Sequence, residues 1–163
     1  MEHNYIIPAK TRIGHVHLKV SDLQRSMDFY CGLLGFQLMA TYGKDAAFIS
    51  AGGYHHHIGL NTWFSKNGSP PAQNTTGLFH TAILYEARKD LAIIFKRLLD
   101  HNYPITGASD HGVSEAIYLN DPDENGIELY WDRPEKDWSY NEDGSLNMFT
   151  KGLDLKSLLN ELN

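Results

Sequence analysis

The sequence has little of what disulfide-bonded, secreted or membrane-spanning proteins need. Its 163 residues include a single cysteine, Cys31, so no intramolecular disulfide can form. The longest apolar run, residues 91–95, falls far short of the ~18 residues that cross a membrane. No charged-then-apolar signal segment precedes Ile13. We therefore expect a cytoplasmic protein in which Cys31 is a buried, inert thiol.

Positive charge is also scarce. Lys and Arg number 14 against 20 Asp and Glu, which gives a net charge of −6. Because no Lys/Arg cluster supplies the required positive potential, neither nucleic acid nor a membrane surface is expected as a partner. The remaining composition, 42% hydrophobic and 12% aromatic, is that of a globular protein. Histidine occurs nine times, and three of these residues are consecutive at 55–57.

Residues 13–62 show the pattern of a strand, a helix and three further strands. Polar and apolar residues alternate over 13–20, as in a strand with one face on a core. Helical spacing follows, and the helix is expected to stop at Gly35; its apolar positions are Leu23, Met27, Tyr30 and Leu34. Three short β-prone stretches lie at roughly 36–42, 46–51 and 54–62.

The same pattern recurs after a linker at 64–77. Residues 80–85 predict a strand, 91–98 a helix, and 103–106, 113–120 and 126–131 three more strands. His80 follows His15 by 65 residues, with the helix at the same distance after each, which indicates a diverged repeat. The sequence thus predicts one α+β domain over residues 1–163. Two βαβββ modules, about 11–63 and about 78–133, form a cupped mixed sheet that we expect to be continuous, since neither module can bury much alone.

Two segments outside this pattern have simpler interpretations. The acidic run DPDENG at 121–126 is expected to be a tight turn, because it lacks the ligand spacing of a calcium loop. In the tail, 134–163, the stretch LDLKSLLNEL at 153–162 predicts a short helix that packs on the body or on a second subunit.

Candidate metal ligands fall at matching positions of the two modules. His15 and His80 each open the first strand of a module, and Glu128 lies in the last strand of the second. If the modules form a pseudo-symmetric cup, these three side chains converge. Two imidazoles and one carboxylate leave about three coordination positions open, which suits Fe(II) and O2, although Mn(II), Zn(II) or another divalent metal can occupy such a site. Gly59 stands where the first module would need its carboxylate, so a fourth ligand is absent.

Three segments carry a family resemblance: IGHVHLKVSDLQRSMDFYCGLLGF at 13–36, GLFHTAILY at 77–85 and HGVSEAIYLNDPDENGIELYWDRP at 111–134. Together they resemble the vicinal oxygen chelate superfamily, which includes glyoxalases, bleomycin resistance proteins and extradiol dioxygenases. The last segment is most similar to catechol-2,3-dioxygenase-like proteins. The resemblance implies metal ligation by His15, His80 and Glu128. It also implies a tyrosine that hydrogen-bonds the substrate oxygen, at Tyr118, and an acid/base histidine, at His56.

The remaining histidines have alternative roles. Strand parity with Gly59 would aim His55 or His57, rather than His56, into the cup, so His57 is kept as a second acid/base candidate. His17 shares the polar face of His15, and His111 corresponds approximately to a basic histidine of the family. Both are expected behind the ligands rather than among them.

The resemblance implies a metal-dependent extradiol-type dioxygenase that uses O2 to cleave a catechol-like aromatic substrate in aromatic compound catabolism. In this superfamily the modules pair within one chain or exchange between two, and we expect a homodimer. Three alternatives share the fold. A glyoxalase-type lyase or isomerase resembles a site with two glutamates, one of which Gly59 replaces here. A fosfomycin-type thiol transferase needs a basic pocket, which a net charge of −6 disfavours. A metal-free small-molecule binding (resistance) protein has no need of three retained ligands.

Overall fold

The computed structural model describes residues 5–72 and 74–163, and it contains the two predicted modules in the predicted order. The first module consists of β1 (Val16–Lys19), α1 (Leu23–Met27), a π-helical turn (Asp28–Leu33), β2 (Gln37–Tyr42), β3 (Ala46–Ser50) and β4 (Ile58–Asn61). The second consists of β5 (Thr81–Tyr85), α2 (Arg88–Asp100), β6 (Gly107–Asp110), β7 (Ser114–Asn120) and β8 (Gly126–Asp132). The α+β class and the βαβββ repeat are confirmed.

The two modules have the same sheet topology. The first sheet has the order β1-β4-β3-β2 and the second β5-β8-β7-β6-β9, with β1–β4 and β5–β8 paired in parallel. The expectation of one continuous sheet is wrong, because hydrogen bonding divides the strands into two sheets with β1 and β5 at their edges. The modules instead join through side chains, so burial does not require a hydrogen-bonded junction between the sheets.

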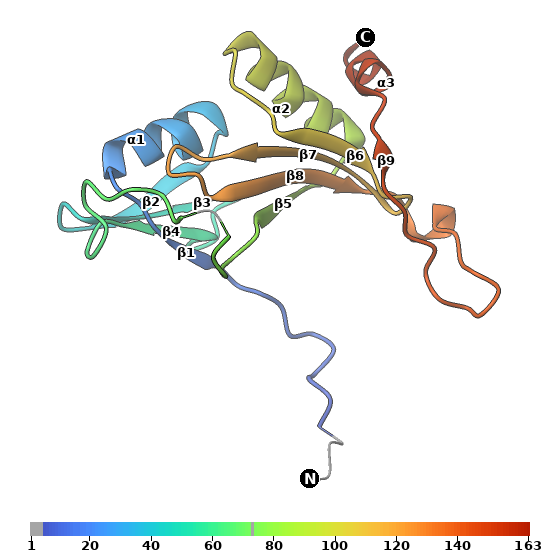
Figure 1. The fold of residues 1–163 in the computed structure, drawn as a ribbon, viewed down its shortest axis with the longest axis horizontal. Helices are drawn as coiled ribbons and strands as arrows, with labels where there is room; N and C mark the ends of the chain where they lie inside the picture. Colours follow the sequence, from blue (N-terminus) through green and yellow to red (C-terminus); the bar gives the residue numbers. More distant parts are fainter. Residues whose placement is uncertain (1–4, 73) are drawn as a thin grey trace.

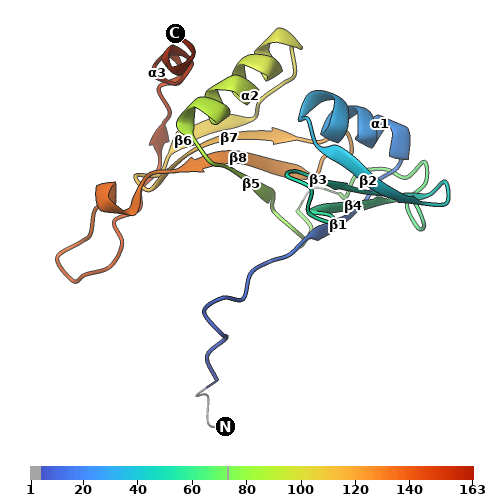
Figure 2. The same cartoon turned by 180° about the vertical axis from the view of Figure 1, so that it is seen from behind.

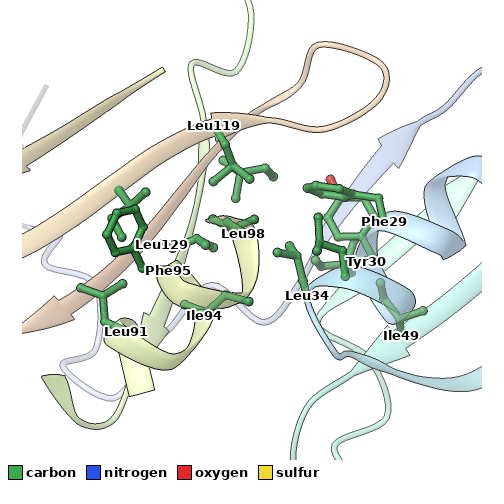
Figure 3. Close-up of a cluster of buried hydrophobic side chains, with 14 of the residues drawn as sticks. Phe29, Tyr30, Leu34, Ile49, Leu91, Ile94, Phe95, Leu98, Leu119 and Leu129 are labelled. Atoms are coloured by element: carbon green, nitrogen blue, oxygen red, sulfur yellow. The ribbon is translucent and has the colours of Figure 1, made fainter. Parts of the chain in front are cut away.

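That junction is a shared hydrophobic core. Helices α1 and α2 lie on the same side of the two sheets (Figure 1, and from behind in Figure 2). Figure 3 shows Leu34 of the first module approaching Ile94 and Leu98 of the second, and all three belong to one cluster of buried residues. Burial of side chains of this kind contributes about 1.5–3 kcal/mol each. The two modules are therefore held together by side chains on the face of the sheets that α1 and α2 cover.

Two polar contacts reinforce the junction. Arg97 on α2 donates to the backbone carbonyls of Gly32 and Leu33, at 2.7 Å each, where the π-helical turn ends. The buried Tyr30 hydroxyl donates to Asp121 at 2.9 Å. Burial, with the Asp121 charge, raises the pKa of Tyr30, which keeps the phenol protonated as a donor.

The acidic run at 121–126 is a tight turn, as predicted. The Asp121 carboxylate accepts the backbone N–H groups of Asp123 and Asn125. The Asp123 carboxylate accepts the backbone N–H of Ser21 and pairs with Arg25. Both carboxylates thus join the β7–β8 turn to the first module.

Several boundaries differ from the predicted ones. The helix expected over 23–34 becomes π-helical after Met27, but it stops at Gly35, whose φ of +87° suits glycine. Strand β4 begins at Ile58, so the histidine run lies before it. The strand expected at 103–106 lies instead at β6, 107–110, and Tyr103 packs on Phe29 in the segment before it. His15 and His80 each immediately precede a first strand, which preserves their equivalence.

The tail packs on the second module. It contains a 3-10 turn (Glu135–Asp137), β9 (Lys151–Gly152) on the edge of β6, α3 (Leu155–Leu159) and a final 3-10 turn (Asn160–Leu162). Helix α3 lies beside α2 and buries Leu158 completely. Arg88 on α2 donates to Glu161 at 2.7 Å and to Glu115 at 2.7 Å. Packing on the body is thus the correct alternative for the predicted tail helix.

Cys31 is partly buried, and burial raises the pKa of its thiol, which disfavours the reactive thiolate. Among the described residues, no helix combines the length and the apolar character needed to cross a bilayer.

The start of β5 passes closely over Gly126. A Cβ atom at this position would lie 2.2 Å from the Phe79 carbonyl oxygen and 3.2 Å from the His80 Cβ. We predict that Gly126→Ala destabilises the protein by about 1–3 kcal/mol, since backbone must move. Urea denaturation checks this. Gly77→Ala, whose Cβ meets nothing within 4 Å, is the control, and equal stability of the two variants would contradict the prediction.

Candidate metal and substrate site

The candidate site lies on the sheet face opposite the shared core. Strand alternation sends Ile127 and Leu129 of β8 into that core, where they are buried. Glu128, between them, therefore projects from the other face. On β7 the same alternation buries Ile117 and Leu119 and turns Tyr118 toward Glu128, its cross-strand partner.

His80 and Glu128 are in direct contact. The His80 Nε2 lies 3.0 Å from Glu128 Oε2, and the two side chains are 30% and 13% exposed. They approach because Gly126 admits the start of β5 and because the small Ala82 is the β5 partner of Glu128. The structure thus brings together two of the three predicted ligands.

Tyr118 and His111 extend this contact into a chain. The Tyr118 hydroxyl donates to Glu128 Oε1 at 3.0 Å and lies 2.7 Å from His111 Nε2. Burial, together with the hydrogen bond and the charge of Glu128, raises the pKa of Tyr118 to about 12. The phenol is therefore protonated at neutral pH. Its proton has two acceptors in reach, the carboxylate and, in the neutral ring, the imidazole nitrogen.

The first module has no carboxylate at the equivalent position. Gly59 pairs with His17 and Phe48, just as Glu128 pairs with Ala82 and Tyr118 in the second module. This register confirms that Gly59 is the counterpart of Glu128. The His17 ring lies over the glycine, since a Cβ there would be 2.9 Å from the imidazole. His17 also contacts the rings of Phe48 and Trp63, so it fills the space over Gly59, which we call the first cup; the equivalent space over Glu128 is the second cup.

The remaining histidines of the first module gather next to this cup. The rings of His15 and His56 are 4.4 Å apart, and His56 Nδ1 is 2.8 Å from His55 Nδ1. Burial, followed by the neighbouring imidazoles, lowers the pKa of His56. His57 turns away from this group, since its Nδ1 is 2.9 Å from Ser50 Oγ at the end of β3.

Two cavities flank His80. One, of about 640 Å³, lies between the modules and is lined by His15, His57, His80 and Tyr130. The other, of about 350 Å³, lies beside Tyr118 and is also lined by Phe79, Thr106 and Asn120. Both volumes lie in the usual range for small-ligand sites. His80 thus borders both cavities.

The His80–Glu128 pair fits a divalent cation. An imidazole nitrogen and a carboxylate oxygen are both common ligands of divalent ions, and here they lie 3.0 Å apart. Across residues 5–72 and 74–163, however, no three His, Cys, Asp or Glu side chains gather closely enough to hold one ion. His15 lines the cavity that borders His80 but lies against His56. The pair therefore offers two ligand atoms to one ion. His15 lines the same cavity as His80 but is not in contact with the pair.

Comparison with known proteins identifies the family of this chain. The profile of the Glyoxalase/Bleomycin resistance protein/Dioxygenase superfamily matches residues 12–129, which include both cups and Glu128. The chain belongs to this superfamily.

Two curated proteins to which the chain is similar are named as dioxygenases. The chain is 41% identical over 154 residues to the catechol-2,3-dioxygenase of Bacillus subtilis, a match that covers 93% of this chain and 52% of the relative. It is 28% identical over 129 residues to biphenyl-2,3-diol 1,2-dioxygenase 2 of Rhodococcus globerulus, covering 76% and 64%. The chain thus spans about half the length of the catechol-2,3-dioxygenase.

Solved structures confirm the fold. A glyoxalase/dioxygenase from Nostoc punctiforme superposes with a TM-score of 0.64 at 18% identity, over 80% of this chain and 99% of that one. Lactoylglutathione lyase from Agrobacterium tumefaciens superposes with a TM-score of 0.59 at 16% identity, over 76% and 96%.

Some residues around the site could not be found by sequence reasoning. Thr106 and Asn120 line the smaller cavity, and the Phe149 carbonyl contacts His111. No periodicity or motif marks these residues. Phe149 lies 38 positions from His111, so only the path of the tail brings them together.

The raised pKa of Tyr118 gives a test of the Glu128 contact. Glu128→Gln removes a negative charge that opposes phenolate formation, so the pKa of Tyr118 falls from about 12 toward the ordinary value of about 10. Ultraviolet titration of the tyrosinate band measures it, with Tyr118→Phe to identify the component. Glu86→Gln, at an exposed position, should leave this pKa unchanged. An unshifted Tyr118 in Glu128→Gln would contradict the contact.

Proposed function

We propose that this protein is a metal-dependent extradiol dioxygenase that uses O2 to open the ring of a catechol-like aromatic substrate. The observation that carries the proposal is the continuous contact of His80 with Glu128 and of Glu128 with Tyr118, at 3.0 Å each. It supplies two metal-ligating groups and a phenol next to them. The similarity to a catechol-2,3-dioxygenase and to biphenyl-2,3-diol dioxygenases supports this reaction class.

His15, His80 and Glu128 would hold the metal, with Fe(II) as the first candidate and Mn(II) or Zn(II) as alternatives. When bound, such an ion lowers the pKa of a substrate hydroxyl, and Fe(II) also carries electrons between the aromatic ring and O2. An arrangement in which His15 completes the set requires its side chain to leave His56 and turn into the cavity it already lines.

The surrounding side chains would bind the substrate and move protons. The cavity of about 350 Å³ next to Tyr118 has room for one aromatic ring, with Phe79 at its wall. Tyr118, protonated at neutral pH, would donate a hydrogen bond to the substrate oxygen. His56, whose pKa is lowered, would accept a proton at its imidazole nitrogen, and His57 is the second candidate for this step because it lines the larger cavity.

The first cup argues against a glyoxalase-type lyase. Such a site would need a second carboxylate at Gly59, where the ring of His17 occupies the space instead. The carboxylate of the site therefore comes from the second module alone.

The proposal predicts that activity depends on Glu128. After anaerobic reconstitution with Fe(II), and in parallel with Mn(II), air and a panel of catechols should give a yellow ring-fission product coupled to oxygen uptake. Glu128→Ala should lower this rate by at least ~100-fold, because it removes a ligand. Glu86→Ala, which removes an exposed carboxylate, is the control. A metal-loaded protein that is inactive on the whole panel, or an active Glu128→Ala, would contradict the proposal.

The assignment of His15 has a separate test. His15→Ala should weaken Fe(II) binding by at least ~10-fold, whereas His17→Ala should not, because His17 packs over Gly59 and away from the ligand pair. Elemental analysis after desalting gives the metal content of each variant. Full metal content in His15→Ala would remove His15 from the ligand set.

A further inference from the structure

The C-terminal tail runs directly beside His111. Strand β9 pairs with β6, with Lys151 opposite Asp110 and Gly152 opposite Ser109. Two residues before β9, the backbone N–H of Phe149 donates to the His111 carbonyl at 3.3 Å. The tail therefore extends the second sheet up to the turn that carries His111.

The tail also contacts the His111 ring. The ring Nδ1 lies 3.1 Å from the Phe149 carbonyl oxygen and 3.3 Å from the Thr150 hydroxyl. A carbonyl oxygen only accepts hydrogen bonds, so the Phe149 contact favours the tautomer that carries its proton on His111 Nδ1, and the Thr150 hydroxyl can accept from the same N–H. In the neutral ring, Nε2 is then an acceptor, and it lies 2.7 Å from the Tyr118 hydroxyl.

Packing fixes Phe149 in this place. Its ring covers Gly112, where a Cβ would lie 2.7 Å from the ring and where φ is +81°. The Lys151 ammonium lies 4.2 Å from the centre of the same ring. Beyond β9, the buried Leu158 and the Arg88–Glu161 ion pair anchor α3 to α2. The Phe149 carbonyl is thus held in position by the packing of its own ring and by the anchored segment that follows β9.

We propose that residues 149–150 are a positioning element of the candidate site, which selects the His111 tautomer and so directs the Tyr118 hydroxyl. The catalytic part of this role rests on the proposed function, whereas the selection of the tautomer does not. Without the Phe149 contact, the proton of a neutral His111 is free to move to Nε2, which then donates to Tyr118 instead of accepting from it. The phenol proton would lose one of its two acceptors and would be held by Glu128 alone.

The comparisons place this element outside the common fold but inside the match to the dioxygenase. The superfamily profile ends at residue 129, before the tail. The match to the catechol-2,3-dioxygenase covers 93% of this chain, so it includes Phe149 and Thr150 even if every unmatched residue lies at the C-terminal end. An element that serves this reaction, and not the fold, is expected to lie outside the superfamily profile and inside the match to the dioxygenase.

The tautomer can be observed without any assay of activity. The full chain, labelled with ¹⁵N-histidine and without added metal, is titrated with pH while two-dimensional spectra of the ring nitrogens are recorded. His111→Gln identifies the His111 signals by their loss. We expect the neutral wild-type ring to carry its proton on Nδ1. A proton on Nε2 in the wild type overturns the proposal, whether or not the protein is a dioxygenase.

Variants of the tail test the cause. Phe149→Ala removes the ring over Gly112 and should shift neutral His111 toward the Nε2-protonated form, whereas Phe149→Leu should retain most of the Nδ1 form. Met148→Ala, at the preceding exposed side chain, is the matched control and should leave the spectrum unchanged. If Phe149→Ala fails to fold, Thr150→Val, which replaces the hydroxyl with a methyl group and keeps the Phe149 carbonyl, takes its place: the neutral ring should keep its proton on Nδ1, and a shift to Nε2 would overturn the proposal. An unchanged His111 spectrum in a folded Phe149→Ala overturns the proposal.

The kinetic consequence is measured on the Fe(II)-loaded protein. Phe149→Ala should lower kcat by about 10-fold with altered pH dependence, whereas Met148→Ala should not. A shifted tautomer with unchanged kcat and pH profile would overturn the catalytic role. A wild-type protein with the Nδ1 tautomer but no ring cleavage would instead reject the proposed function and leave the tautomer assignment in place.

Discussion

The close passage of β5 over Gly126 is the constraint on which the site depends. A side chain at this position would collide with the Phe79 carbonyl, 2.2 Å from its Cβ, and would separate β5 from β8. With glycine there, the two strands pair in parallel with Ala82 opposite Glu128, and His80 reaches the carboxylate. Since a slip of one residue reverses the faces of a strand, this register decides whether histidine and glutamate meet at all.

The two modules keep one topology but use their cups differently. At the central position of the first cup stands Gly59, covered by the ring of His17, and at that of the second stands Glu128, open to His80 and Tyr118. Phe48 and Tyr118 occupy equivalent cross-strand positions, so one hydroxyl separates a packed aromatic ring from a proton donor. Both modules thus provide the same scaffold, but only the second places polar, chemically active side chains in its cup.

Electrostatics favours a cation at the second cup. In the described part of the chain, the ion-pair partner of Glu128 is His80 alone. Arg133, which follows β8, is paired with Asp110 and Glu115. The Glu128 charge also raises the pKa of Asp132, after the larger contribution of burial. Among the described residues, Glu128 therefore has no lysine or arginine as an ion-pair partner, which leaves its charge available to a divalent cation.

Local patterns in the sequence determined the modules, the helix stop at Gly35 and the equivalence of His15 with His80, because periodicity and spacing are properties of neighbouring residues. The repeat also identified Gly59 as the counterpart of Glu128, which the strand register of the two modules confirms. Only the tertiary structure decided that the sheets are separate and joined by a core, and that His15 lies against His56. It alone also brought the Phe149 carbonyl to His111, because contacts between distant segments depend on how the chain packs and leave no periodic signal in the sequence.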